Sequence, residues 1–136
     1  MPDQGVLVDT SVWVRFFRLP RASESLHLDR LIQLQEVRTC APVRAEVFSG
    51  ARTERERFSL QEYFLAIPLL ELPADAWERV EEARFRLARK GRQASLIDLL
   101  IACAAASHEA ALWSLDEDFA DIRQALPFAP YLPEVP

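Results

Sequence analysis

Carboxylates interrupt or end apolar segments at four places along the chain. The acids concerned are Asp9, Glu46, Asp98 and the neighbouring pair Asp116 and Asp118. A carboxylate in apolar surroundings is costly to bury unless it is paired or binds a cation. If the fold brings these acids together, they form a site for a hard cation, because Mg²⁺ and Mn²⁺ prefer oxygen ligands.

The other metal-binding residue types point away from zinc. The only cysteines are Cys40 and Cys103, the only histidines are His27 and His108, and no Cys-x-x-Cys pair is present. We therefore expect neither a structural zinc site nor a disulfide framework. Any metal would be held by carboxylates.

Each acid also has an interpretation that needs no metal. Asp9 fits a cap for the helix that follows it, and Glu46 fits a solvated helix face. Ser95 and Asp98 have the spacing of a capping box, in which the acidic side chain accepts a hydrogen bond from a backbone N–H at the helix start. The last two acids fit a turn and the first turn of a helix. No single acid decides between the two interpretations.

Short strand patterns alternate with helical patterns along the chain. Strands are expected over residues 6–8, 37–40, 69–72 and 112–115, and the tail from Pro127 to Pro136 is expected to be an edge strand or irregular. Helices are expected over residues 12–17, 26–35, 43–48, 53–66, 74–90 (with Trp77 and Phe85 facing inward), 95–109 and 116–126. This alternation predicts an α/β fold with a small, mostly parallel β-sheet flanked by α-helices. Ligands of such sheets bind beyond the carboxyl ends of the strands, where Asp9 and Asp116 fall.

Size and composition favour one domain spanning residues 1–136, with half of the residues apolar and only 3 glycines. No apolar run approaches the roughly 20 residues of a membrane span. The opening MPDQGVLVDT lacks the basic stretch and long apolar core of a signal peptide, so a cytoplasmic protein is expected. The net charge of −5 argues against coating nucleic acid by bulk electrostatics. The basic residues are nearly all Arg, whose planar fork suits phosphate contacts.

Four segments resemble, in order and spacing, the motifs of PIN domains, and particularly of VapC-type toxins. The segment VLVDTSVW (6–13) resembles the opening motif, a strand followed by an aspartate, a hydroxyl residue and an apolar helix. The other three segments resemble the second, third and fourth motifs, and they are PVRAEV (42–47), SLIDLLIA (95–102) and SLDEDF (114–119). The resemblance extends over essentially the whole chain.

The resemblance implies a PIN-like fold and a Mg²⁺-dependent endoribonuclease (Mn²⁺ is an alternative) that is the toxin of a toxin–antitoxin pair. Water would attack an RNA phosphodiester in line, with Asp9, Asp98 and Asp116 holding metal. Glu46 would bind metal or orient the water, and Asp118 would be a second ligand or a support for Asp116.

The resemblance also assigns supporting residues and partners. Thr10 and Ser11 occupy the place of the family's site hydroxyls, and helix capping is an equally good interpretation of both. Separately from the resemblance, the phosphate chemistry of arginine makes Arg44, Arg52 and Arg89 candidates for contacts with RNA phosphates, and a solvated face paired with neighbouring glutamates is the alternative interpretation of each. The implied partners are an RNA substrate, a cognate antitoxin and a second copy in a homodimer, with no membrane.

Three alternatives are left by the sequence. The first is a PIN nuclease that serves RNA processing, and the second is a catalytically silent protein-binding module. The third is a phosphatase of the haloacid-dehalogenase type, which places a nucleophilic aspartate after its first strand. That class usually carries a second acid two residues later, where this chain has Ser11. It also needs a downstream lysine, and Lys90, the single lysine here, does not lie in a matching sequence context.

Overall fold

The computed structural model describes residues 5–133, in which four parallel strands form one sheet in the order β2-β1-β3-β4. The strands are β1 (Val6–Val8), β2 (Val37–Arg38), β3 (Ala111–Trp113) and β4 (Ala129–Pro130). The helices are α1 (Thr10–Arg18), α2 (Ser23–Gln33), α3 (Ala41–Ser49), α4 (Glu54–Phe64), α5 (Ala76–Arg89), α6 (Leu96–His108) and α7 (Phe119–Ala125). The predicted α/β fold is confirmed, and within the described range the sheet is entirely parallel. The expectations for the first four residues and for Pro136 lie outside that range.

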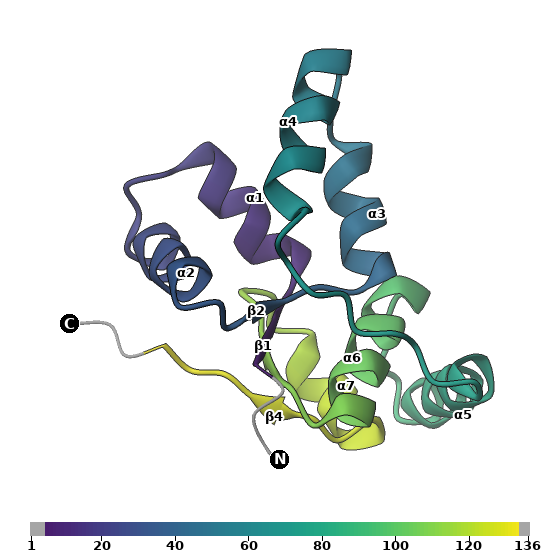
Figure 1. Ribbon diagram of the computed structural model, residues 1–136. Helices are drawn as coiled ribbons and strands as arrows, with labels where there is room; N and C mark the ends of the chain where they lie inside the picture. The colour runs from purple at the N-terminus through teal and green to yellow at the C-terminus, as the bar shows by residue number, and fades with distance from the viewer. Residues whose placement is uncertain (1–4, 134–136) are drawn as a thin grey trace.

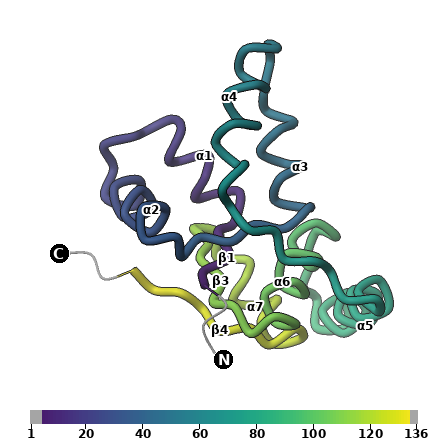
Figure 2. The backbone as a smooth tube through the Cα atoms, in the orientation of Figure 1, coloured from purple at the N-terminus to yellow at the C-terminus, as the bar shows by residue number. Residues whose placement is uncertain are grey.

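Helices cover the sheet on two sides. In Figure 1, α1 and α2 lie on one side of the sheet and α5, α6 and α7 on the other, while α3 and α4 form a pair that projects away from it. The backbone trace in Figure 2 shows the same separation of α2 from α5. Because α3 packs against both α1 and α6, it joins the two helical layers. This junction lies at the carboxyl ends of the strands.

The strand β1 and the helix α6 form the centre of the core. All three residues of β1 are buried, and so is every residue of α6 from Leu99 to Ala105. The helix is enclosed because it contacts α3, α5, α7 and β3. Small side chains in its second half let these neighbours approach closely. No helix within residues 5–133 is long and apolar enough to cross a membrane.

The strand expected over residues 69–72 is wrong. Only Leu69 joins the sheet, through a single parallel bridge to Thr39. The segment lies between Pro68 and Pro73, and proline has no N–H to donate to a strand ladder. The strand expected over residues 112–115 begins one residue earlier and ends at Trp113.

The inward orientation expected for Trp77 and Phe85 is also wrong, because these side chains are 54% and 61% exposed. The buried stripe of α5 consists of Ala76, Val80, Ala83 and Leu87. These mostly small residues recur at helical spacing and let α5 pack closely on α6. The larger aromatic side chains therefore fall on the outer faces of the helix.

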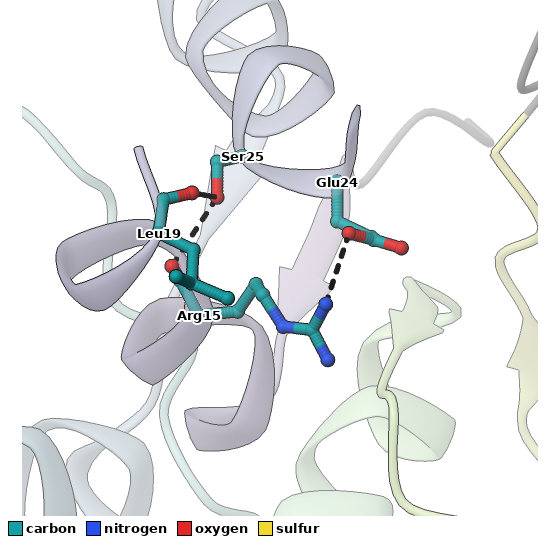
Figure 3. A network of polar contacts seen from close by, with 4 residues as sticks. All are labelled: Arg15, Leu19, Glu24 and Ser25. Atoms are coloured by element: carbon teal, nitrogen blue, oxygen red, sulfur yellow. Dashed lines mark hydrogen bonds and ion pairs between the residues drawn. The ribbon is translucent and has the colours of Figure 1, made fainter. Parts of the chain in front are cut away.

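A buried hydroxyl ties α1 to α2 (Figure 3). Ser25 is 1% exposed, and its Oγ donates to the carbonyl of Leu19 at 2.7 Å and lies 3.3 Å from that of Arg15. Arg15 lies in the last turn of α1 and Leu19 directly follows the helix, and both carbonyls also accept a backbone hydrogen bond, from Leu19 and Ala22 respectively. An ion pair of 3.4 Å between Arg15 and Glu24 links the same helices at a more exposed position.

Ser25→Ala is expected to lower the free energy of unfolding by about 1 kcal/mol, because it removes the hydrogen bond between a buried hydroxyl and the carbonyl of Leu19. Urea denaturation followed by circular dichroism measures the change. Ser59→Ala, an exposed serine of α4, is the matched control and should change stability by less than about 0.5 kcal/mol. Equal stabilities of the two variants would contradict this role of Ser25.

Candidate active site

Asp9 lies at the carboxyl end of the central strand β1. Its backbone N–H donates to the carbonyl of Trp113 on β3 at 2.9 Å, and its side chain caps α1. With neighbours on both sides of the strand, the residue is only 3% exposed. The expected capping role is therefore present, and the carboxylate is also buried at the edge where parallel sheets bind ligands.

Two hydroxyl groups hold one oxygen of Asp9. Ser11 Oγ donates to Asp9 Oδ2 at 2.7 Å, Ser114 Oγ donates to the same atom at 2.8 Å, and the backbone N–H of Ser11 lies 3.3 Å from it. Among the hydrogen bonds of residues 5–133, none is accepted by Oδ1. The hydroxyls thus compensate the burial of the carboxylate and leave its second oxygen available for a ligand.

Glu46 reaches the same place from α3. That helix begins directly after β2, and Pro42 occupies its first turn, where a missing N–H costs nothing. Thr10 Oγ1 donates to Glu46 Oε1 at 2.6 Å, which fixes the orientation of a partly exposed carboxylate. As in Asp9, one oxygen is held by a hydroxyl and the other accepts no hydrogen bond from the described residues.

Asp98 completes a three-acid cluster from the first turn of α6. One carboxylate oxygen from each of Asp9, Glu46 and Asp98 lies within 4.8 Å of the others. The backbone N–H of Asp98 donates to Ser95 Oγ at 3.0 Å, so part of the expected capping box is present as well. The capping and cluster interpretations of this residue are therefore compatible.

The pKa of Asp98 is raised to about 6 by burial and then by the negative charge of Asp9, with smaller contributions from Asp116 and Glu46. A hydrogen bond with the Ser95 side chain opposes the rise. Like charges at this separation favour protonation or cation binding, because either one relieves their repulsion.

Asp116 and Asp118 follow β3 and are exposed. The backbone N–H of Asp116 donates to Ser114 Oγ, and that of Asp118 donates to Asp116 Oδ1, both at 2.9 Å. Neither acid belongs to the three-acid cluster. Asp116 is nevertheless close enough for its charge to raise the pKa of Asp98, an effect not found for Asp118. Asp118 instead supports the turn that holds Asp116.

Ser114 is a site residue that the sequence pattern did not reveal. The pairing of β1 with β3 places the residues after Val8 and Trp113 side by side, and this register is visible only in the structure. A serine there faces Asp9 across the strand ends. Its hydroxyl links Asp9 to the backbone of Asp116 and so joins the first and last motifs.

The three arginines expected to contact phosphate come from three different elements. Arg44 is half-buried on α3, with its guanidinium carbon 4.4 Å from the ring centroid of Phe48. Arg52 is exposed in the loop between α3 and α4, and Arg89 is exposed at the end of α5. The structure does not bring these three side chains together.

The donor set fits a hard divalent cation. All three cluster acids offer oxygen, the ligand atom preferred by Mg²⁺ and Mn²⁺. Cys40 is fully buried, and its burial and the charges of Asp9 and Glu46 raise its pKa to about 12 despite a backbone hydrogen bond that lowers it. Its thiol stays protonated, so it is neither a soft ligand nor a nucleophile.

Residues 6–125 match the PIN domain family, and the chain belongs to that family. Among curated relatives, the VapC ribonuclease Mb1587 of Mycobacterium bovis is 30% identical over 118 residues, which cover 84% of this chain and 88% of the relative. Ribonuclease VapC5 of Mycobacterium tuberculosis is 33% identical over 121 residues, covering 88% and 87%.

Solved structures show the same fold. The VapBC-5 toxin–antitoxin structure from Mycobacterium tuberculosis contains a chain that is 28% identical, with a TM-score of 0.63 and coverage of 96% of this chain and 100% of that one. A chain of FitAB bound to the IR36 DNA fragment has a TM-score of 0.74 at 20% identity, covering 93% of each chain.

Asp98→Asn is expected to stabilise the metal-free protein at pH 8. The pKa of Asp98 is raised in the folded state, so the protonated carboxyl contributes stability that is present at pH 4 and lost as the pH rises through about 6. Removing the charge should add about 1–2 kcal/mol at pH 8, after allowance for solvent screening, and almost nothing at pH 4.

Urea denaturation in EDTA at both pH values measures this difference. Asp75→Asn, which removes an exposed charge beside the start of α5, is the matched control and should have little effect. A purely capping role for Asp98 predicts the opposite sign, because an acid in the first turn stabilises a helix.

Proposed function

We propose that this protein is a Mg²⁺- or Mn²⁺-dependent endoribonuclease, formed by a single PIN domain, and the toxin of a toxin–antitoxin pair in the cytoplasm. The observation that carries the proposal is the convergence of Asp9, Glu46 and Asp98 at the carboxyl edge of the sheet. Membership of the PIN domain family and the similarity to proteins named VapC ribonucleases support it.

Asp9 and Asp98 would hold the cation, with Asp116 as a further ligand. A bound divalent cation lowers the pKa of water and stabilises negative charge on a phosphoryl oxygen. The hydrogen bond from Thr10 leaves one oxygen of Glu46 available to bind metal or to orient the attacking water. Ser11 and Ser114 hold the Asp9 side chain in place by donating to a single oxygen.

The silent binding module is the weaker alternative, because the acids of all four motifs are present. The choice between a toxin and an RNA-processing enzyme rests on the relatives, which are named as VapC ribonucleases. On the basis of the family resemblance we also propose that the protein forms a homodimer. Analytical ultracentrifugation of the purified protein would measure the mass of the assembly.

The purified protein is expected to cut a mixture of cellular RNAs into discrete fragments with Mg²⁺ or Mn²⁺, and EDTA should abolish the cleavage. Asp98→Asn should lower the rate by at least about 100-fold, because it removes a metal ligand. Asp116→Asn should have a larger effect than Asp118→Asn, since only Asp116 acts on the cluster. Gel electrophoresis of the RNA measures the rates.

Asp75→Asn is again the control and should cut at the wild-type rate. Cleavage that survives both EDTA and Asp98→Asn would overturn the proposed mechanism. A folded protein that binds Mg²⁺ without cutting any RNA class would favour the binding module.

An apolar groove beside the acidic cluster suits the proposed antitoxin. Its volume is about 490 Å³, and it lies between α1, α3 and α4. The lining includes the exposed rings of Phe17 and Tyr63, and Glu46 stands at its margin. An amphipathic helix of a partner fits such a groove, and a basic residue of the same partner would reach the acids. The partner would then block the cluster directly.

Induction of the protein in a bacterial host is expected to arrest growth, and co-expression of an antitoxin encoded beside its gene should restore it. Phe17→Glu should keep RNA cleavage but escape this neutralisation, because a charge in the groove opposes apolar docking. Colony counts with and without the antitoxin measure the effect. Phe58→Glu, an exposed phenylalanine of α4 outside the groove lining, is the control and should still be neutralised.

A further inference from the structure

The end of α5 carries the strongest concentration of positive charge in the chain. Residues 83–97 contain no acid and five basic residues, although the whole chain has a net charge of −5. We call these five residues the basic cluster: Arg84, Arg86, Arg89, Lys90 and Arg92. Cations at a helix C-terminus stabilise the helix by interacting with its dipole. That effect is confined to the last turn and does not explain a run of cations that continues to Arg92.

The chain reversal after α5 gathers these side chains around the helix end. Gly91 has a φ of +73°, and the N–H of Arg92 donates to the carbonyl of Leu87 while that of Gly91 donates to Ala88. This is the Schellman arrangement, which turns the chain back sharply at a glycine. Arg92 is thereby returned beside α5 instead of continuing away from it.

Two hollows lie on either side of this helix end. One has a volume of about 350 Å³ and is lined by Arg86, Arg89, Lys90 and Gln124 among others. The second, of about 220 Å³, is lined by Arg84, Arg92 and Gln93 together with the backbone at Gly91. Most of the polar side chains that line the two hollows are therefore cationic donors, as binding of an anion requires.

Most of the positive charge is not neutralised locally. Arg86 pairs with Glu82 at 2.6 Å in an exposed ion pair, and Arg92 pairs with Asp121 at 3.5 Å. Within residues 5–133, no carboxylate lies within ion-pair distance of Arg84, Arg89 or Lys90. These three cations remain available to a ligand.

An exposed aromatic ring lies among the cations. Phe85 is 61% exposed, and the guanidinium carbon of Arg89 lies 5.7 Å from its ring centroid. Any polyanion would pair with the cations. The carboxylates of an acidic peptide, however, would offer no stacking partner to the ring. Single-stranded nucleic acid uses both features, because its phosphates pair with cations while its bases stack on aromatic rings.

A short segment of chain connects the basic cluster to the acidic cluster. Asp98 follows Arg92 by six residues, which span at most about 20 Å. Arg92 also pairs with Asp121 on α7, three residues after Asp118, which supports the turn that holds Asp116. One RNA strand can therefore contact both clusters.

We propose that the basic cluster binds the phosphates of a single-stranded RNA segment, with Phe85 stacking on one of its bases, and positions that strand across the acidic cluster. This inference rests on the proposed ribonuclease function and assigns its substrate-binding surface. Of the three arginines expected to contact phosphate, it selects Arg89 rather than Arg44 or Arg52.

The test measures binding of a labelled single-stranded RNA of about 12 nucleotides by fluorescence anisotropy in EDTA, where no cutting occurs. The double variant Arg89→Gln/Lys90→Gln should bind about tenfold more weakly near 0.1 M salt, and its slope of log affinity against log salt should fall by about 1.4. Arg89→Lys/Lys90→Arg keeps both charges and should retain most of the affinity.

The matched control is Arg21→Gln/Arg30→Gln, which removes two exposed charges in and just before α2. Figure 1 shows α2 and α5 on opposite sides of the sheet. It should bind RNA like the wild type. Equal losses of RNA affinity in both double variants would mean that only the overall charge of the protein matters, and would overturn the inference. Unchanged affinity in Arg89→Gln/Lys90→Gln would overturn it too, and would favour an acidic protein as the ligand.

Cleavage assays with Mg²⁺ separate this inference from the proposed function. The Arg89→Gln/Lys90→Gln variant should show a raised KM with kcat nearly unchanged, whereas Asp98→Asn should lose kcat. If the wild-type protein cuts RNA and this double variant has the same KM, the proposed substrate-binding surface alone is overturned. Wild type that binds RNA through the basic cluster without cutting it would overturn the ribonuclease alone.

Discussion

The buried carboxylate of Asp9 is the constraint on which the rest of the site depends. It ends the central strand of a parallel sheet, so neighbouring strands enclose it and water cannot satisfy it. The hydroxyls of Ser11 and Ser114 take the place of water. The same hydroxyls accept hydrogen bonds from the backbone of Leu115 and Asp116, so satisfying one buried acid also shapes the turn after β3.

The acidic cluster is an arrangement that folding alone would not favour. Each carboxylate would be more stable apart from the others, and the raised pKa of Asp98 records their repulsion together with its burial. The sheet and α6 bring the acids together because their backbones are held by extensive apolar packing elsewhere. Stability in the core thus compensates for a strained electrostatic arrangement at the edge, as is common where a site serves chemistry.

Charge in this protein is organised locally rather than globally. A net charge of −5 suggests poor affinity for nucleic acid, yet one run of 15 residues contains five cations and no acid. The run ends at the helix that carries Asp98. The cations therefore come directly before the segment that carries one of the three clustered acids, and the proposed nuclease would use the two features together.

The sequence by itself determined the α/β class, most element positions and the four acidic motifs, because strand and helix periodicity and strand-end acids are local signals. It did not determine which face of α5 is buried. Trp77 and Phe85 are strongly apolar, but the close approach of α6 selects the smaller stripe of Ala76, Val80 and Ala83. Only the tertiary structure separated Asp98, which joins Asp9 and Glu46, from Asp118, which supports a turn. It also assigned Ser114 to the site, because the contact with Asp9 joins residues 105 positions apart and depends on strand register. Side chains that meet across a sheet are set by register and packing, which no local stretch of sequence encodes.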